Sequence, residues 1–248
     1  MYAWGFGQQG AGGNFPCTSL SSPSGAAAHS TSFFVSSVAT SLLLMQQSGD
    51  SSYNGYISDT LPKLKAAAQW LAQDDTWSAL TAYDKPYAHR RFLVGTALGL
   101  TAKLTGDTAM AQKAQGYVKE GLGLQQSDGV FPEQGGYDSS YQTASLYYAG
   151  VYYAITDDAG LRAQLATAIK KGADWSRSRY NDDGSANLAG NTRVTDGSND
   201  ENGPGGSPKT FAYRSGFESL MEAYKITGDQ ADYDEAKKVA LYKGWITN

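Results

Sequence analysis

The chain has 248 residues and a formal net charge of −4, from 20 lysines and arginines and 24 aspartates and glutamates. With 41% hydrophobic and 18% charged residues, the composition is globular and excludes a disordered or fibrous chain. The single cysteine, Cys17, excludes an internal disulfide framework and any cysteine-rich metal site. Negative charge without a run of basic residues argues against nucleic acid as the main partner.

Membrane-directed segments are not expected either. The longest apolar stretch, around residues 42–45, is too short to cross a bilayer. The N-terminus lacks the basic and apolar regions of a signal peptide, as would a secreted protein from which that peptide had been removed. The sequence therefore predicts no membrane partner.

In chain order, the first predicted element is an extended arm at residues 1–28, rich in glycine, serine and alanine. Four helical hairpins follow, and in each an apolar helix leads through a short turn into a more polar helix. The expected apolar helices span residues 32–47, 90–104, 141–155 and 215–226. The expected polar helices span residues 55–73, 109–124, 159–180 and 231–245.

The turns between the paired helices indicate an internal repeat. Each turn ends on an aspartate, and these anchors lie 57, 51 and 71 residues apart, at Asp50, Asp107, Asp158 and Asp229. Glycine is suited to ending the first helix and aspartate to capping the second. The longest interval contains a polar insertion at residues 181–207, expected to be a long loop; its acidic residues lack EF-hand spacing, so no metal is expected there.

The two helices of each hairpin differ in pattern. The first is nearly all apolar, as if it touched neighbours all round, whereas the second is apolar on one face, as at Ile57, Leu61 and Leu64. Apolar helices inside a ring of amphipathic ones form an (α/α) toroid. We therefore expect one all-α catalytic domain over residues 1–248, a closed or open toroid of about four hairpins. The alternative is an irregular helical bundle.

In a toroid the inner helices run in one direction, so their N-termini share a rim. Helix N-termini also present free N–H groups and a positive dipole, which favour anions. The candidate residues at this rim are His29, Tyr87, His89, Arg90, Arg91, Glu133, Gln134, Tyr137, Tyr141, Gln142, Tyr213 and Arg214. The long loop could add Asn191 and Arg193.

Such a set suits proton removal from C5 of a uronic acid, because that hydrogen is acidic only when the carboxylate is neutralised. An arginine, or an amide such as Gln134 or Gln142, would stabilise the enolate-like intermediate. A tyrosine beside a cation would take the C5 proton and return it to the departing O4, with His89 as a second base or a donor to the carboxylate. Tyr137 and Tyr141 are four residues apart and share one helix face.

Residues 87–92 (Tyr-Ala-His-Arg-Arg-Phe) and the stretch from Asp128 to Gln142 resemble the (α/α)-toroid polysaccharide lyases. The alginate and glucuronan lyases, with their heparinase-like relatives, are the closest in pattern. The resemblance covers roughly residues 85–150, and the remainder only as architecture. It implies a lyase that cleaves a uronic-acid polymer by β-elimination, with His89 matching the family's histidine and Tyr141 its base and acid. Tyr137 is the second choice for that role.

The chain departs from the family pattern at two positions. Ala88 stands where the family has an asparagine, and Gln134 where it has an arginine, so Arg91, Arg193 or Arg214 would have to substitute. The resemblance further implies an acidic polysaccharide as partner, no cofactor, and a secreted or periplasmic location. Because the chain is short for a closed toroid, a partner subunit could complete an open ring.

Two other functions remain open at this point. A glycoside hydrolase of the same architecture would use Glu133 with a second carboxylate, such as Asp138 or Asp128. A non-catalytic carbohydrate-binding module would stack Trp4, Trp77 and the tyrosines on sugar rings.

Overall fold

The computed structural model describes residues 2–15, 23–84, 87–133, 135–194 and 210–247. Over these ranges the protein is all-α, with isolated bridges of Glu133 to Gly136 and Tyr180 to Ala186 as the sole β pairing. The predicted all-α class is confirmed. The helices are α1 (Tyr2–Phe6), α2 (Pro23–Gln47), α3 (Asn54–Leu71), α4 (Asp74–Asp84), α5 (Ala88–Thr105), α6 (Thr108–Gly123), α7 (Ser139–Ile155), α8 (Ala159–Arg177), α9 (Tyr213–Thr227) and α10 (Gln230–Tyr242).

Contacts within the chain divide it into two compact units. Unit 1 comprises Met1–Lys85 and Arg90–Lys119, and unit 2 comprises Pro86–His89 and Glu120–Asn248. The boundary therefore falls inside α5, after His89, and inside α6, after Lys119.

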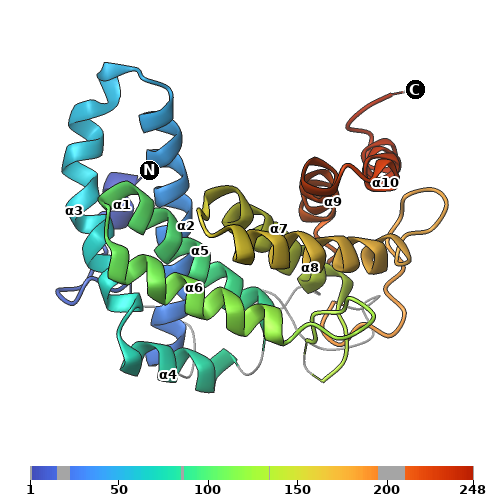
Figure 1. Cartoon of the computed structure of the whole chain (residues 1–248), viewed down its shortest axis with the longest axis horizontal. Coiled ribbons are helices and arrows are strands. Elements are labelled where there is room, and N and C mark those ends of the chain that lie inside the picture. Colours follow the sequence, from blue (N-terminus) through green and yellow to red (C-terminus); the bar gives the residue numbers. More distant parts are fainter. Residues whose placement is uncertain (1, 16–22, 85–86, 134, 195–209, 248) are drawn as a thin grey trace. The chain divides into compact units, whose positions relative to one another are not determined.

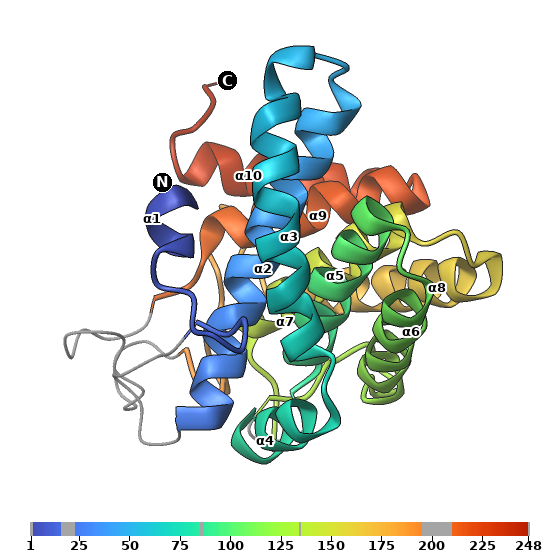
Figure 2. The same cartoon turned by 90° about the vertical axis from the view of Figure 1, so that its left-hand side faces the viewer.

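Unit 1 is built around α2, which packs along both α3 and α4. Figures 1 and 2 both show α2 and α3 side by side. Between α5 and α6 the approach is close, because a methyl group at Gly95 would overlap the side chain of Val118. The fully buried apolar side chains of this unit include Val35, Val38, Leu42, Leu64, Phe92 and Leu98.

Unit 2 packs α7 against α8 and α9, and α9 against α10 (Figure 1, yellow to red). Its fully buried apolar side chains include Leu146, Leu161, Leu165, Ile169 and Leu220. Helix α7 thus lies between α8 and α9, and both pack against it. The N-terminus of α7 is the place where the loops before α7 and after α8 come together.

The predicted helix pairs and their turns are confirmed. Three turns contain a glycine in the left-handed region, where a side chain is disfavoured, with φ of +70° at Gly49, +70° at Gly106 and +74° at Gly228. The turn before α8 has no glycine and instead ends α7 with Thr156 in an extended conformation. The aspartate of each turn accepts a backbone N–H of the helix or 3-10 turn that follows: Asp50, Asp107, Asp158 and Asp229.

The prediction of an extended arm is wrong for part of residues 1–28. Residues 2–6 form α1, and α2 already begins at Pro23, because Ala26, Ala27 and Ala28 favour helix and are buried. The sequence reading also missed α4, whose first turn carries Asp74 and Asp75 at the positive end of the helix dipole. Of the predicted long loop, residues 181–194 are free of helix, and residues 195–207 lie outside the described ranges.

The sequence predicts no apolar stretch long enough to span a bilayer, and by length and composition this prediction is wrong. Within the described ranges one helical segment, Gly25–Gln47 of α2, passes both criteria. A core helix and a signal sequence share these properties. In unit 1 this segment packs Val35, Val38, Ala39 and Leu42 out of contact with solvent.

Candidate active site

The loop that leads into α7 is organised by the side chain of Gln142. Its Oε1 accepts the N–H of Phe131 at 2.8 Å, and its Nε2 donates to the carbonyls of Gly129 at 3.0 Å and Gly172 at 3.3 Å. Because both the oxygen and the nitrogen of this buried amide bond to backbone groups, Gln142 holds the loop in shape. It therefore does not take the substrate-binding role predicted for it.

Glu133 lies at the end of this loop in a tight turn. Its backbone N–H donates to the carbonyl of Gly136 at 2.9 Å, and the N–H of Gly136 donates back at 3.2 Å. These two hydrogen bonds fix the backbone from which the Glu133 side chain extends, and Glu133 is only 2% exposed. The neighbouring candidate Gln134 lies outside the described residues.

Asp138 caps α7 and also holds the loop that follows α8. Its Oδ1 accepts the N–H groups of Ser140 at 3.0 Å and Tyr141 at 3.1 Å. Its Oδ2 accepts the N–H groups of Arg193 at 3.0 Å and Val194 at 2.5 Å. Burial raises the pKa of this fully buried carboxyl above its ordinary value, and the four N–H bonds act in the opposite direction.

Two further side chains attach the same loop to the start of α7. The hydroxyl of Thr192 donates to the carbonyl of Glu133 at 2.6 Å. The Oδ1 of Asn191 accepts the N–H of Ser139 at 3.1 Å, and its Nδ2 donates to the carbonyl of Val194 at 2.7 Å. Asn191 was predicted to bind substrate, and in the structure its amide is engaged in holding the loop.

These attachments bring together a buried ionic group in unit 2. The Oε2 of Glu133 lies 3.1 Å from Nδ1 of His89, and its Oε1 pairs with the guanidinium of Arg193. His89 is 3% exposed and Arg193 is 9% exposed. One carboxylate therefore lies between an imidazole nitrogen and a guanidinium, out of contact with bulk solvent, where electrostatic interactions are strong.

Tyr141 completes this group from the first turn of α7. The guanidinium carbon of Arg193 lies 4.0 Å from the centre of its ring, and the imidazole ring of His89 lies 4.8 Å away. The ring of Tyr87 is also stacked with the imidazole of His89, with 6.0 Å between the ring centres. Tyr141 is half-buried, whereas the other four members of the group are buried. Tyr141 is therefore the most solvent-accessible member of the group.

Other predicted residues of unit 2 lie outside this group. Tyr137 precedes α7, so the prediction that it shares a helix face with Tyr141 is wrong, and its hydroxyl donates to the carbonyl of Ala189 at 2.9 Å. The hydroxyl of Tyr213 accepts the N–H of Ala186 at 3.1 Å, and Arg214 is an exposed side chain paired with Glu218.

Three predicted residues belong to unit 1. The side chains of His29 and Arg90 are hydrogen-bonded through Nε2 and Nη1. The guanidinium of Arg91 lies 5.3 Å from the ring centre of Trp77. These contacts occupy the three side chains within their own unit.

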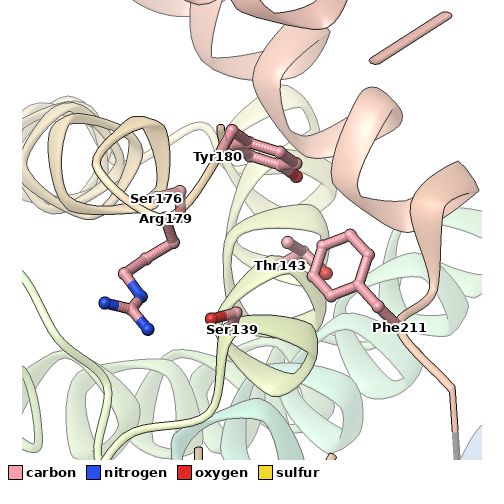
Figure 3. A pocket seen from close by; sticks show the side chains of 6 residues that line it. All are labelled: Ser139, Thr143, Ser176, Arg179, Tyr180 and Phe211. Atoms are coloured by element: carbon pink, nitrogen blue, oxygen red, sulfur yellow. The ribbon is translucent and has the colours of Figure 1, made fainter. Parts of the chain in front are cut away.

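A small hollow lies on another side of α7, with about 170 Å³ of empty space that includes open solvent. Its lining consists of Ser139, Thr143, Ser176, Arg179, Tyr180 and Phe211. In Figure 3 the guanidinium of Arg179 is directed away from the rings of Tyr180 and Phe211. That guanidinium lies over the ring of Tyr137 and donates to the carbonyls of Asn187 and Ala189. Burial raises the pKa of Tyr180 well above its usual range, so its phenol is neutral.

The structure also assigns roles that the sequence reading missed. The sequence suggests Asp138 only as a second carboxylate of a hydrolase, whereas in the structure it caps α7; an aspartate directly before Ser-Ser-Tyr is a capping signal. No local pattern indicated that Thr192 would bind the carbonyl of Glu133.

In comparisons with known proteins, no family model, no curated protein and no solved structure matches the chain.

Proposed function

We propose that this protein is a polysaccharide lyase that cleaves a uronic-acid polymer, of alginate or glucuronan type, by β-elimination. The observation that carries the proposal is the contact of Tyr141 with both Arg193 and His89, since the ring of a half-buried tyrosine thereby lies beside a guanidinium and an imidazole. The helical hairpins would form an open (α/α) toroid, and the enzyme would act outside the cytoplasm, where such polymers occur.

The reaction needs one group that both accepts and returns a proton. As a phenolate, Tyr141 would accept the C5 proton of the uronate; the C4–C5 double bond then forms as the C4–O4 bond breaks, and Tyr141 returns the proton to O4. The guanidinium of Arg193, 4.0 Å from the ring centre, is suited to compensating negative charge on the phenol oxygen and on the adjoining carboxylate. Glu133 would keep Arg193 and His89 in place.

Hydrolysis fits the same residues less well. A glycosidase needs one carboxylic acid that can donate a proton and a second carboxylate across the substrate. Glu133 is engaged by His89 and Arg193, and Asp138 by four backbone N–H groups. Glu133 and Asp138 are both buried. The third candidate, Asp128, is exposed, and its Oδ1 accepts the N–H of Val130 at 3.1 Å within its own loop.

The test is ultraviolet absorbance during incubation with alginate, glucuronan, hyaluronan and a neutral glucan, because β-elimination leaves a double bond conjugated with the carboxylate. We expect absorbance to rise with one uronate polymer, to vanish in Tyr141→Phe, and to persist in Tyr153→Phe, a control on the same helix. New reducing ends without absorbance would replace the proposal with hydrolysis at Glu133. Binding without any product would replace it with a carbohydrate-binding role.

A further inference from the structure

One carboxylate fixes the backbone of both residues that contact each other at the candidate site. Asp138 Oδ1 accepts the N–H of Tyr141, and Asp138 Oδ2 accepts the N–H of Arg193. The two residues are 52 positions apart in the chain and lie on a helix and on a loop respectively. Their side chains then meet, with the guanidinium 4.0 Å from the ring centre.

We infer that Asp138 is a positioning residue that holds Arg193 against Tyr141. The claim that Asp138 holds the two residues together depends only on its hydrogen bonds. The claim that this affects catalysis rests on the proposed function. Asp138 has no exposed surface, so it would not touch a substrate and acts through the two residues it holds.

An ordinary helix cap would need only half of these bonds. Asp158 caps α8 by accepting the N–H of Leu161 at 3.0 Å, and among the described residues its side chain makes no hydrogen bond to a distant loop. Asp138 makes the same kind of cap with one oxygen and uses the other for Arg193 and Val194. Serine at position 138 would keep the cap but is too short to hold the loop as well. The two tasks of Asp138 are thus separable by mutation.

The experiment compares Asp138→Ser with Asp158→Ser by nuclear magnetic resonance of arginine-labelled protein. Stacking on a tyrosine ring shifts the side-chain protons of Arg193, and we expect this shift to be lost in Asp138→Ser and retained in Asp158→Ser. Amide exchange of Arg193 and Val194 should accelerate about tenfold or more in Asp138→Ser, since each loses a bond to a charged acceptor. The amides of Ser140 and Tyr141 should keep their protection. If Asp138→Ser does not fold, Asp138→Asn retains Oδ1 for the cap and replaces Oδ2 with an amide group that cannot accept from the loop.

A kinetic comparison then tests the catalytic meaning. If Asp138 acts through Arg193, Arg193→Ala lowers kcat by about 100-fold, and adding Asp138→Ser lowers it no further. Additive losses would show that Asp138 does not act through Arg193.

The two proposals fail in different ways. An unchanged Arg193 resonance in Asp138→Ser would overturn the positioning role even in an active lyase. A wild-type protein that eliminates no uronate polymer would overturn the proposed function, while the resonance and exchange measurements would still decide whether Asp138 holds the two residues together.

Discussion

Replacing Glu133 with glutamine tests whether the buried ionic group is held by mutual charge. Glutamine has nearly the same shape, but it loses the negative charge and presents an N–H donor to one of its two partners. Because Glu133 and Arg193 are 2% and 9% exposed, the pair belongs to the buried class, for which removal of one partner costs about 3 to 5 kcal/mol. An exposed pair would cost about 1 kcal/mol or less.

The measurement is urea unfolding followed by circular dichroism. Glu218→Gln is the matched control, because Glu218 pairs with Arg214, whose side chain is 84% exposed. We expect the decrease in the free energy of unfolding caused by Glu133→Gln to be several times the decrease caused by Glu218→Gln. The double variant with Arg193→Met should cost less than the sum of the single changes, by about 1 to 3 kcal/mol. Equal effects of Glu133→Gln and Glu218→Gln would refute the reasoning.

Three further predictions follow from local geometry. Gly190→Ala should lower the melting temperature more than Gly135→Ala: both glycines have φ near +80°, but only a methyl group at Gly190 would overlap the hydroxyl of Tyr137. Burial raises the pKa of Asp138 in the folded protein, so protonation of this carboxyl stabilises the folded state. This contribution to the free energy of unfolding is complete below the pKa of the unfolded chain, about 3.9, and is lost as pH rises through the higher pKa of the folded protein. Urea unfolding at several pH values should therefore show wild type losing stability relative to Asp138→Asn as pH rises through that window. Burial raises the pKa of Tyr152 to about 12, so Tyr152→Phe should remove one phenolate transition near that pH from an ultraviolet titration.

The hairpins were predictable because the signals that form them are local. A glycine that adopts positive φ and an aspartate that caps the next helix lie side by side in the chain, as Gly106 and Asp107 do. The short α4 escaped prediction because it is a single 11-residue helix that belongs to none of the four helix pairs. Trp77, stacked at 3.9 Å on Tyr117, is positioned by a contact 40 residues away in the sequence.

The candidate site was predictable in its residue types but not in its contacts. His89, Glu133, Tyr141 and Arg193 were all named from the sequence, and the structure brings them together. The pairing of Glu133 with Arg193 joins residues 60 positions apart and depends on how the loop after α8 folds back. Likewise, nothing local distinguishes an amide such as Gln142, which bonds backbone, from one that would face a substrate.

The loop between α8 and α9 joins two helices that pack directly against each other. The entropic cost of closing such a loop grows only slowly with its length, so insertions there disturb the helical scaffold little. Arg193, the residue that reaches Tyr141, is carried by this same loop. A change in the length and composition of this one connection would therefore alter the surroundings of Tyr141 while leaving the hairpins that support it in place.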